Sequence, residues 1–194
     1  MGSKKESTFL NMVVTLLVIT SVAALALGGV YQLTKEPIAL AKKKKQEKAI
    51  KMVLPEFDHL TSKKVLAYDK SDSLLFTYAY KGESNELVGV AVNSFSDEGF
   101  SGRVEIMVGF LPDGTINNTA VMAHKETPGL GTKMADPSFK DQFKGKNPEN
   151  FKLKVTKDGG DVDAITAATI SSRAFTDAVD RAYKTFKMVK EKNE

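Results

Sequence analysis

The chain of 194 residues contains no cysteine and no tryptophan, and its only histidines are His59 and His124. The lack of cysteine excludes disulfides, cysteine-ligated zinc, iron–sulfur clusters and c-type haem attachment. Two histidines also argue against a histidine-rich metal site, so we expect no metal centre. If this chain carries electrons, it must therefore do so with an organic cofactor.

The net charge of +4 belongs to the N-terminal segment alone. Residues 1–50 hold eight lysines against three acidic residues, whereas residues 51–194 hold 20 basic and 21 acidic residues, a net charge of −1. A nucleic-acid-binding domain needs a basic face, so no nucleic-acid partner is expected. A hydrophobic content of 42% with 27% charged residues is typical of a globular protein.

The N-terminal segment has the length and polarity of a transmembrane helix. No residue between Ser7 and Thr34 is charged, and residues 9–31 can cross about 30 Å of hydrocarbon at about 1.5 Å per residue. A cleaved signal peptide is the alternative, because Ala24-Leu25-Ala26 resembles a cleavage site. The apolar run exceeds the usual signal-peptide core of about 7–15 residues, which favours an anchor.

The charges around this segment leave its orientation open. Lys4 and Lys5 favour a cytoplasmic N-terminus over residues 1–8, whereas the run Lys42–Lys45 favours the opposite orientation. Residues 32–55 predict a second helix, a juxtamembrane stalk, with Pro37 in its first turn and Pro55 at its end. Its lysines would lie close to lipid phosphates, so the lipid bilayer is an expected partner.

Residues 56–194 predict one α+β domain, a mainly antiparallel sheet with flanking helices, preceded by the transmembrane helix. Short turns and alternating apolar residues predict a strand meander, and Asp136-Pro137 predicts the start of a short helix. Phe175, Ala178, Val179 and Phe186 belong to an amphipathic helix that ends near Lys190. The expected strands are 74–81, 86–94, 102–110 and 115–124, with a further possible strand at 151–155.

Hydroxyl side chains gather just before the C-terminal helix, in the stretch DAITAATISS. They belong to Thr166, Thr169, Ser171 and Ser172. Free N–H groups and the positive end of the helix dipole would favour a phosphate there. The alternative is ordinary helix capping, since Ser171 or Ser172 alone could serve as the N-cap.

The stretch HKETPGLG comes at the end of the predicted strand 115–124 and predicts a loop with exposed backbone amides. Thr127-Pro128-Gly129 predicts a tight turn, and glycines flank Leu130 on both sides. Such a loop can lie flat against a planar ring and donate N–H groups to its oxygens and nitrogens. The alternative is a plain loop between two strands, with His124 an ordinary histidine at a strand end.

Together the two motifs resemble the flavin-binding domain shared by the G subunit of Rnf electron-transport complexes and the C subunit of the sodium-translocating NADH:quinone reductase. The flavin attachment motif of this family is Asp, two variable residues, Ser or Thr, then Gly-Ala-Thr. Asp163 to Thr169 is similar to it, and Glu126 to Gly131 matches the second hallmark of the family. The short chain is more like the Rnf protein. One residue departs from the motif, because Ala167 replaces the usual glycine and would be strained if that position required a positive φ.

The resemblance implies a covalent FMN, joined through its phosphate to Thr169 by a dedicated flavin transferase. Asp163 and Thr166 are expected to position the phosphate or the complex with the transferase, and the Glu126–Gly131 loop to line the isoalloxazine. The full set of expected cofactor-binding residues is Asp163, Thr166, Ala167, Ala168, Thr169, Ser171, Ser172, His124, Glu126, Thr127, Pro128, Gly129, Leu130, Gly131 and Lys133.

The resemblance also implies a location and a function. The chain would be a single-pass protein of the bacterial cell membrane with its FMN domain, residues 56–194, on the extracytoplasmic side. It would relay electrons among the other subunits of an ion-translocating ferredoxin:NAD oxidoreductase, without turnover of its own. The alternatives are the matching subunit of the quinone reductase, or an anchored binding or assembly module without a cofactor.

Overall fold

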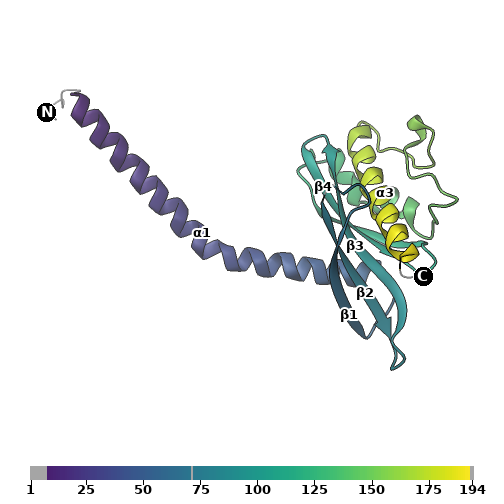
Figure 1. Ribbon diagram of the computed structural model, residues 1–194. Helices are drawn as coiled ribbons and strands as arrows, with labels where there is room; N and C mark the ends of the chain where they lie inside the picture. The colour runs from purple at the N-terminus through teal and green to yellow at the C-terminus, as the bar shows by residue number, and fades with distance from the viewer. Residues whose placement is uncertain (1–7, 71, 193–194) are drawn as a thin grey trace. The chain divides into compact units, whose positions relative to one another are not determined.

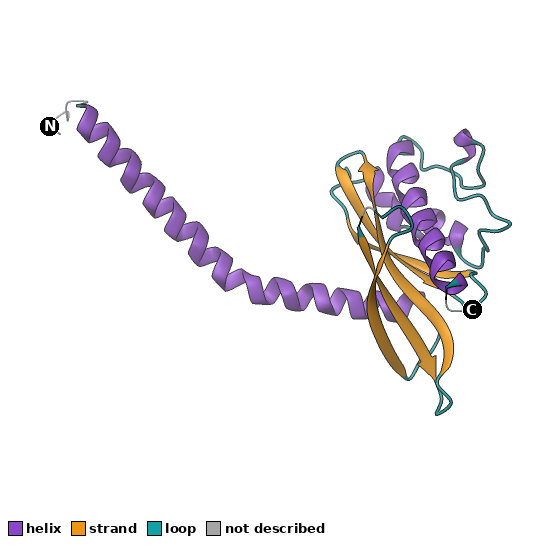
Figure 2. Ribbon diagram, viewed as in Figure 1, coloured by secondary structure: helices purple, strands orange, loops and turns teal. Residues whose placement is uncertain are grey.

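The computed structural model describes residues 8–70 and 72–192, so the predicted cytoplasmic segment 1–8 lies, except for Thr8, outside the described residues. The chain divides into two units between Lys44 and Lys45. Figure 1 follows the chain by residue number, and Figure 2 distinguishes helices from strands by colour. The second unit carries the folded domain and starts at Lys45, whereas the sequence predicted a domain that starts at Glu56.

The first helix, α1, extends from Phe9 to Val53 without interruption. The prediction of a separate second helix with Pro37 in its first turn is wrong, because Pro37 lies inside α1. A proline removes one helical hydrogen bond, and good helix formers such as alanine, leucine and lysine surround it here. By length and composition α1 is the one helix among residues 8–70 and 72–192 that could cross a membrane, with a window of mean hydropathy 2.4.

Five antiparallel strands form one sheet in the order β1-β2-β3-β4-β5, a simple meander. The predicted α+β class and four of its strands are confirmed, as β2 (Ser73–Lys81), β3 (Glu86–Gly99), β4 (Gly102–Phe110) and β5 (Ile116–Ala123). The edge strand β1 (His59–Leu66) was missed, because nearly all its side chains are exposed and give no alternating pattern. The prediction of a strand at 151–155 is wrong; within that range only Val155 forms an isolated bridge, to Val162.

The long C-terminal helix α3 (Thr169–Glu191) covers one face of the sheet, mainly over β3 and β4 (Figure 1). Its apolar stripe packs on Phe76, Ile106 and Phe110, as the 3.6-residue period predicted. Between β5 and α3 the chain forms short helical turns: η1 (Gly131–Ala135), α2 (Pro137–Lys140), η2 (Asp141–Phe143) and η3 (Thr156–Asp158). The short helix expected at Asp136-Pro137 is therefore present as α2 and η2.

The end of α1 covers the opposite face of the sheet. Ala49, Ile50, Val53 and Leu54 pack on Ala79, Ala91, Met107 and Ala120, a surface made mostly of small residues. Asn117 and Asn118 donate side-chain hydrogen bonds to the carbonyls of Val53 (2.8 Å) and Met52 (3.1 Å). The last carbonyls of a helix have no partner within it, so these two asparagines complete its end. The last turns of α1 are thus part of the folded domain.

Candidate functional site

A cavity of about 320 Å³ opens where the β3–β4 turn, the loop after β5 and the start of α3 meet. Thr169 is the first residue of α3 and Leu130 belongs to the loop, so both predicted motifs contribute to one cavity. The lining residues are Phe100, Glu126, Thr127, Leu130, Gly131, Ala167, Ala168, Thr169, Ile170 and Ser171.

Several predicted site residues lie elsewhere. Asp163, Thr166 and Lys133 line a second cavity of about 390 Å³, together with Gln142. Gln142 holds the backbone of Asp163 on both sides: its Oε1 accepts from the Asp163 N–H (2.8 Å) and its Nε2 donates to the Asp163 carbonyl (3.1 Å). The structure therefore does not bring Asp163 and Thr166 into the cavity of Thr169.

Four predicted residues line neither cavity: His124, Pro128, Gly129 and Ser172. The Nδ1 atom of His124 accepts a hydrogen bond from the Glu126 N–H (3.2 Å). Ser172 is buried, accepts from the Ile165 N–H (2.9 Å) and donates to the Ala168 carbonyl (3.0 Å). His124 and Ser172 thus shape the two segments that form the cavity without lining it.

The helix-capping alternative for the serines is wrong. The N-cap position of α3 is Ala168, and no side chain caps it. Ser171 instead donates its hydroxyl to the Glu126 carboxylate (2.5 Å). The positive end of a 23-residue helix therefore opens at Thr169 without a capping side chain among the described residues.

Glu126 joins three elements beneath the cavity. Its side chain is 4% exposed; Oε1 accepts from the Ser101 N–H in the β3–β4 turn (3.0 Å), and Oε2 accepts from Ser171 in α3. Gly131 is glycine because a Cβ there would lie 2.5 Å from the Ser171 hydroxyl and 2.8 Å from Glu126 Oε2. The sequence interpretation of Gly131 as an exposed amide is thus corrected, because Gly131 is buried and makes room for this contact.

Two residues of the cavity were missed from the sequence, Phe100 and Ile170. Phe100 lies in the β3–β4 turn with 68% of its surface exposed, and Ile170 is 45% exposed beside Thr169. With Leu130, which is 41% exposed, they form an apolar rim. Two features of the sequence could have indicated these residues: Phe100 is an aromatic residue in a turn, and Ile170 lies outside the apolar stripe of its helix.

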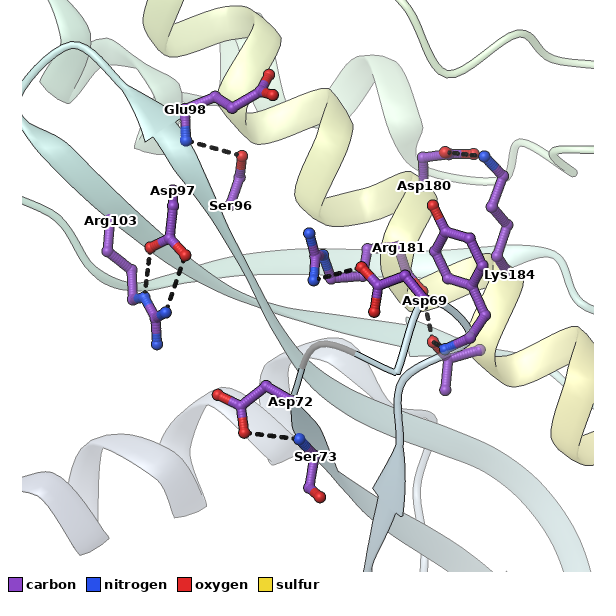
Figure 3. Close-up of polar contacts among 12 residues, drawn as sticks. Asp69, Asp72, Ser73, Ser96, Asp97, Glu98, Arg103, Asp180, Arg181 and Lys184 are labelled. Carbon is purple, nitrogen blue, oxygen red and sulfur yellow. Dashed lines mark hydrogen bonds and ion pairs between the residues drawn. The ribbon is translucent and has the colours of Figure 1, made fainter.

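An ion-pair cluster fixes the β3–β4 hairpin that carries Phe100 (Figure 3). Arg103 donates two hydrogen bonds to Asp97, from Nε to Oδ1 (2.7 Å) and from Nη2 to Oδ2 (2.9 Å). These bonds hold the pKa of the Asp97 carboxyl below its ordinary value. The guanidinium groups of Arg103 and Arg181 both contact the Phe95 ring, with their Cζ atoms 3.9 and 4.8 Å from its centroid. The hairpin is therefore fixed from both strands and from α3.

Ala167 has a φ of +60°, the left-handed conformation that costs a residue with a Cβ about 1–2 kcal/mol. We expect Ala167→Gly to raise the free energy of unfolding by about 1 kcal/mol, measured by chemical denaturation. Ala164→Gly is the matched control, because no positive φ is found there and glycine should only add unfolded-state entropy. Equal destabilisation by both substitutions would contradict the strain at Ala167.

The cavity belongs to a recognised class of domain. Residues 99–184 match the FMN-binding domain family, and all ten residues that line the cavity fall within that match. The class of the site is therefore that of a flavin mononucleotide domain.

Sequence similarity over nearly the whole chain identifies the family to which this protein belongs. The chain is 36% identical over 186 residues to the G subunit of the ion-translocating oxidoreductase complex of Methanosarcina acetivorans, covering 94% of this chain and 95% of the relative. It is 33% identical over 185 residues to the G subunit of the Na⁺-translocating ferredoxin:NAD⁺ oxidoreductase complex of Acetobacterium woodii, with 88% of each covered. This chain belongs to the family of G subunits of ion-translocating oxidoreductase complexes.

Among solved structures, the chain is similar to NqrC of Shewanella oneidensis. The identity is 23%, the TM-score is 0.46, and 73% of this chain and 72% of the other are covered.

Proposed function

We propose that this chain is a membrane-anchored electron-transfer subunit that carries FMN, joined through its phosphate to Thr169, within an ion-translocating ferredoxin:NAD oxidoreductase complex. One observation carries the proposal: Thr169 stands at the uncapped start of α3 and opens into the same cavity as the Glu126–Gly131 loop. The names of the relatives, which are subunits of such complexes, supply the expected partners.

The start of α3 suits the phosphate. Its first N–H groups and the positive helix end would stabilise a negatively charged phosphoester on the Thr169 hydroxyl. Thr169 is partly exposed and lines the cavity, as attachment by a flavin transferase would require. The tether would hold the flavin while leaving the ring, which supplies the redox chemistry, to be tuned by its surroundings.

The apolar rim suits the ring. Phe100, Leu130 and Ile170 present exposed apolar surface around a cavity of about 320 Å³, a size at the small end of cofactor sites. We place the isoalloxazine against these three side chains, partly open to solvent. A partly open ring suits a protein that exchanges electrons with neighbouring subunits and has no turnover of its own.

The second cavity has a different role in this proposal. Because Asp163 and Thr166 line this cavity and not that of Thr169, we assign them to recognition by the transferase and not to contact with the bound flavin. The apolar part of α1 would anchor the chain by a single span, with the N-terminus in the cytoplasm and the FMN domain outside it.

The test is a threonine substitution in the full-length chain, produced together with a flavin transferase. Wild type and Thr169→Ser should show a fluorescent band under ultraviolet light after denaturing electrophoresis, and an intact mass raised by FMN less one water. Thr169→Ala should show neither. Covalent flavin in Thr169→Ala, or its absence from wild type, would refute the proposal.

A further inference from the structure

Glu126 is the only ionisable side chain among the ten residues that line the cavity. It is also deeply placed, at 4% exposure, beneath the apolar rim. The remaining lining residues are apolar, glycine or hydroxyl-bearing, so Glu126 is the one lining side chain that can carry a charge.

The hydrogen bonds of Glu126 fit the ionised carboxylate. One oxygen accepts from the Ser101 N–H and the other from the Ser171 hydroxyl, which is an arrangement that suits an ionised carboxylate. Both donors are neutral, and none of the ion pairs found within residues 8–70 and 72–192 includes Glu126. A carboxylate charge on Glu126 would lie against the cavity with little water to screen it.

The surrounding backbone is built to keep this carboxylate in place. A Cβ on Gly99 would lie 2.7 Å from Glu126 Oε1, and a Cβ on Gly131 would lie 2.8 Å from Oε2. Two glycines from different segments thus leave room for the two oxygens. The position of the charge is fixed by packing from the β3–β4 turn, the loop after β5 and α3.

From this geometry we propose that Glu126 lowers the reduction potential of the flavin held in the cavity, an inference that rests on the proposed function. Reduction by one electron adds one negative charge to the ring, and a fixed carboxylate nearby opposes that addition. Charge close to the ring is one of the ways in which a protein tunes a flavin. Glu126 thus favours a flavin that gives its electron onward.

The experiment is a redox titration of the flavinylated full-length protein, with dithionite as electron donor and the flavin absorbance as readout. Glu126→Gln keeps the size of the side chain and removes its charge, and it should shift the midpoint potential to a more positive value. Glu98→Gln is the matched control, because Glu98 is an exposed carboxylate on the same hairpin. Glu98→Gln changes the net charge by the same amount as Glu126→Gln. It should shift the midpoint potential much less, because water screens the charge of Glu98.

A second variant separates charge from packing. Ser171→Ala removes a hydrogen bond to the carboxylate and keeps the charge, so the midpoint should move in the negative direction while thermal stability falls. Equal shifts in Glu126→Gln and Glu98→Gln, or a positive shift in Ser171→Ala, would overturn the proposal. Should Glu126→Gln not retain flavin, the direction of the Ser171→Ala shift decides. Absence of covalent flavin from the wild type would instead refute the proposed function.

Discussion

Gly131→Ala should destroy the cavity between the Glu126–Gly131 loop and the start of α3. The new Cβ would lie 2.5 Å from the Ser171 hydroxyl and 2.7 Å from Glu126 Cβ, distances that real Cβ atoms do not show. The loop and the start of α3 would have to separate, which breaks the bond between Ser171 and Glu126. We expect a loss of about 2–3 kcal/mol in the free energy of unfolding and little or no covalent flavin on Thr169. Chemical denaturation and in-gel flavin fluorescence measure the two effects.

Gly129→Ala is the control from the same loop. Gly129 has a positive φ, +76°, but open space surrounds the place of its Cβ. The substitution should therefore cost about 1 kcal/mol in backbone strain and leave flavin attachment intact. If the two variants lost flavin to the same extent, the packing role assigned to Gly131 would be wrong.

Gly109→Ala should separate the end of α1 from the sheet. The added Cβ would meet the Val53 carbonyl oxygen at 2.0 Å and its carbon at 2.6 Å, and this obstacle is backbone that no rotamer change can move aside. Asn117 and Asn118 would then lose their contacts with the helix end. We expect a loss of about 3 kcal/mol or more in the free energy of unfolding, measured by chemical denaturation.

Gly89→Ala, on the same face of the sheet, is the comparison variant for the stability loss expected in Gly109→Ala. There the nearest atoms are Leu54 Cδ2 and the Phe110 carbonyl oxygen, both at 3.0 Å, and the leucine side chain can move. The loss of stability should be clearly smaller than at Gly109. The reverse order would contradict the tight contact between Val53 and β4.

Much of the fold could be predicted because apolar residues recur along the inner strands and at helical spacing in α3. The positions of β2 and β4 followed from alternating apolar residues together with turn residues, and the C-terminal helix followed from apolar residues at helical spacing. The strand β1 could not be found in this way, since it pairs at the sheet edge with both faces exposed. The continuous helix through Pro37 was also missed, because one proline is a local signal that favourable neighbours can override.

The two segments that form the candidate site were predicted from the sequence, but the contacts between them were not. The stretches around Thr169 and Leu130 do form one cavity. The bond from Ser171 to Glu126 spans 45 positions of the chain and has no local sequence signal. The bonds by which Gln142 holds the backbone of Asp163 in the second cavity also cannot be read from the motif.

Two adjacent residues of the β3–β4 turn, Phe100 and Ser101, contribute to the cavity in different ways. Ser101 contributes its main-chain N–H to Glu126, a group that every amino acid except proline possesses, so most substitutions of Ser101 should keep this contact. Phe100 contributes only its exposed ring, so a change there would alter the mouth of the cavity and leave its base untouched. The chemistry of the cavity mouth can thus be varied by substitution while the backbone contact to Glu126 is kept.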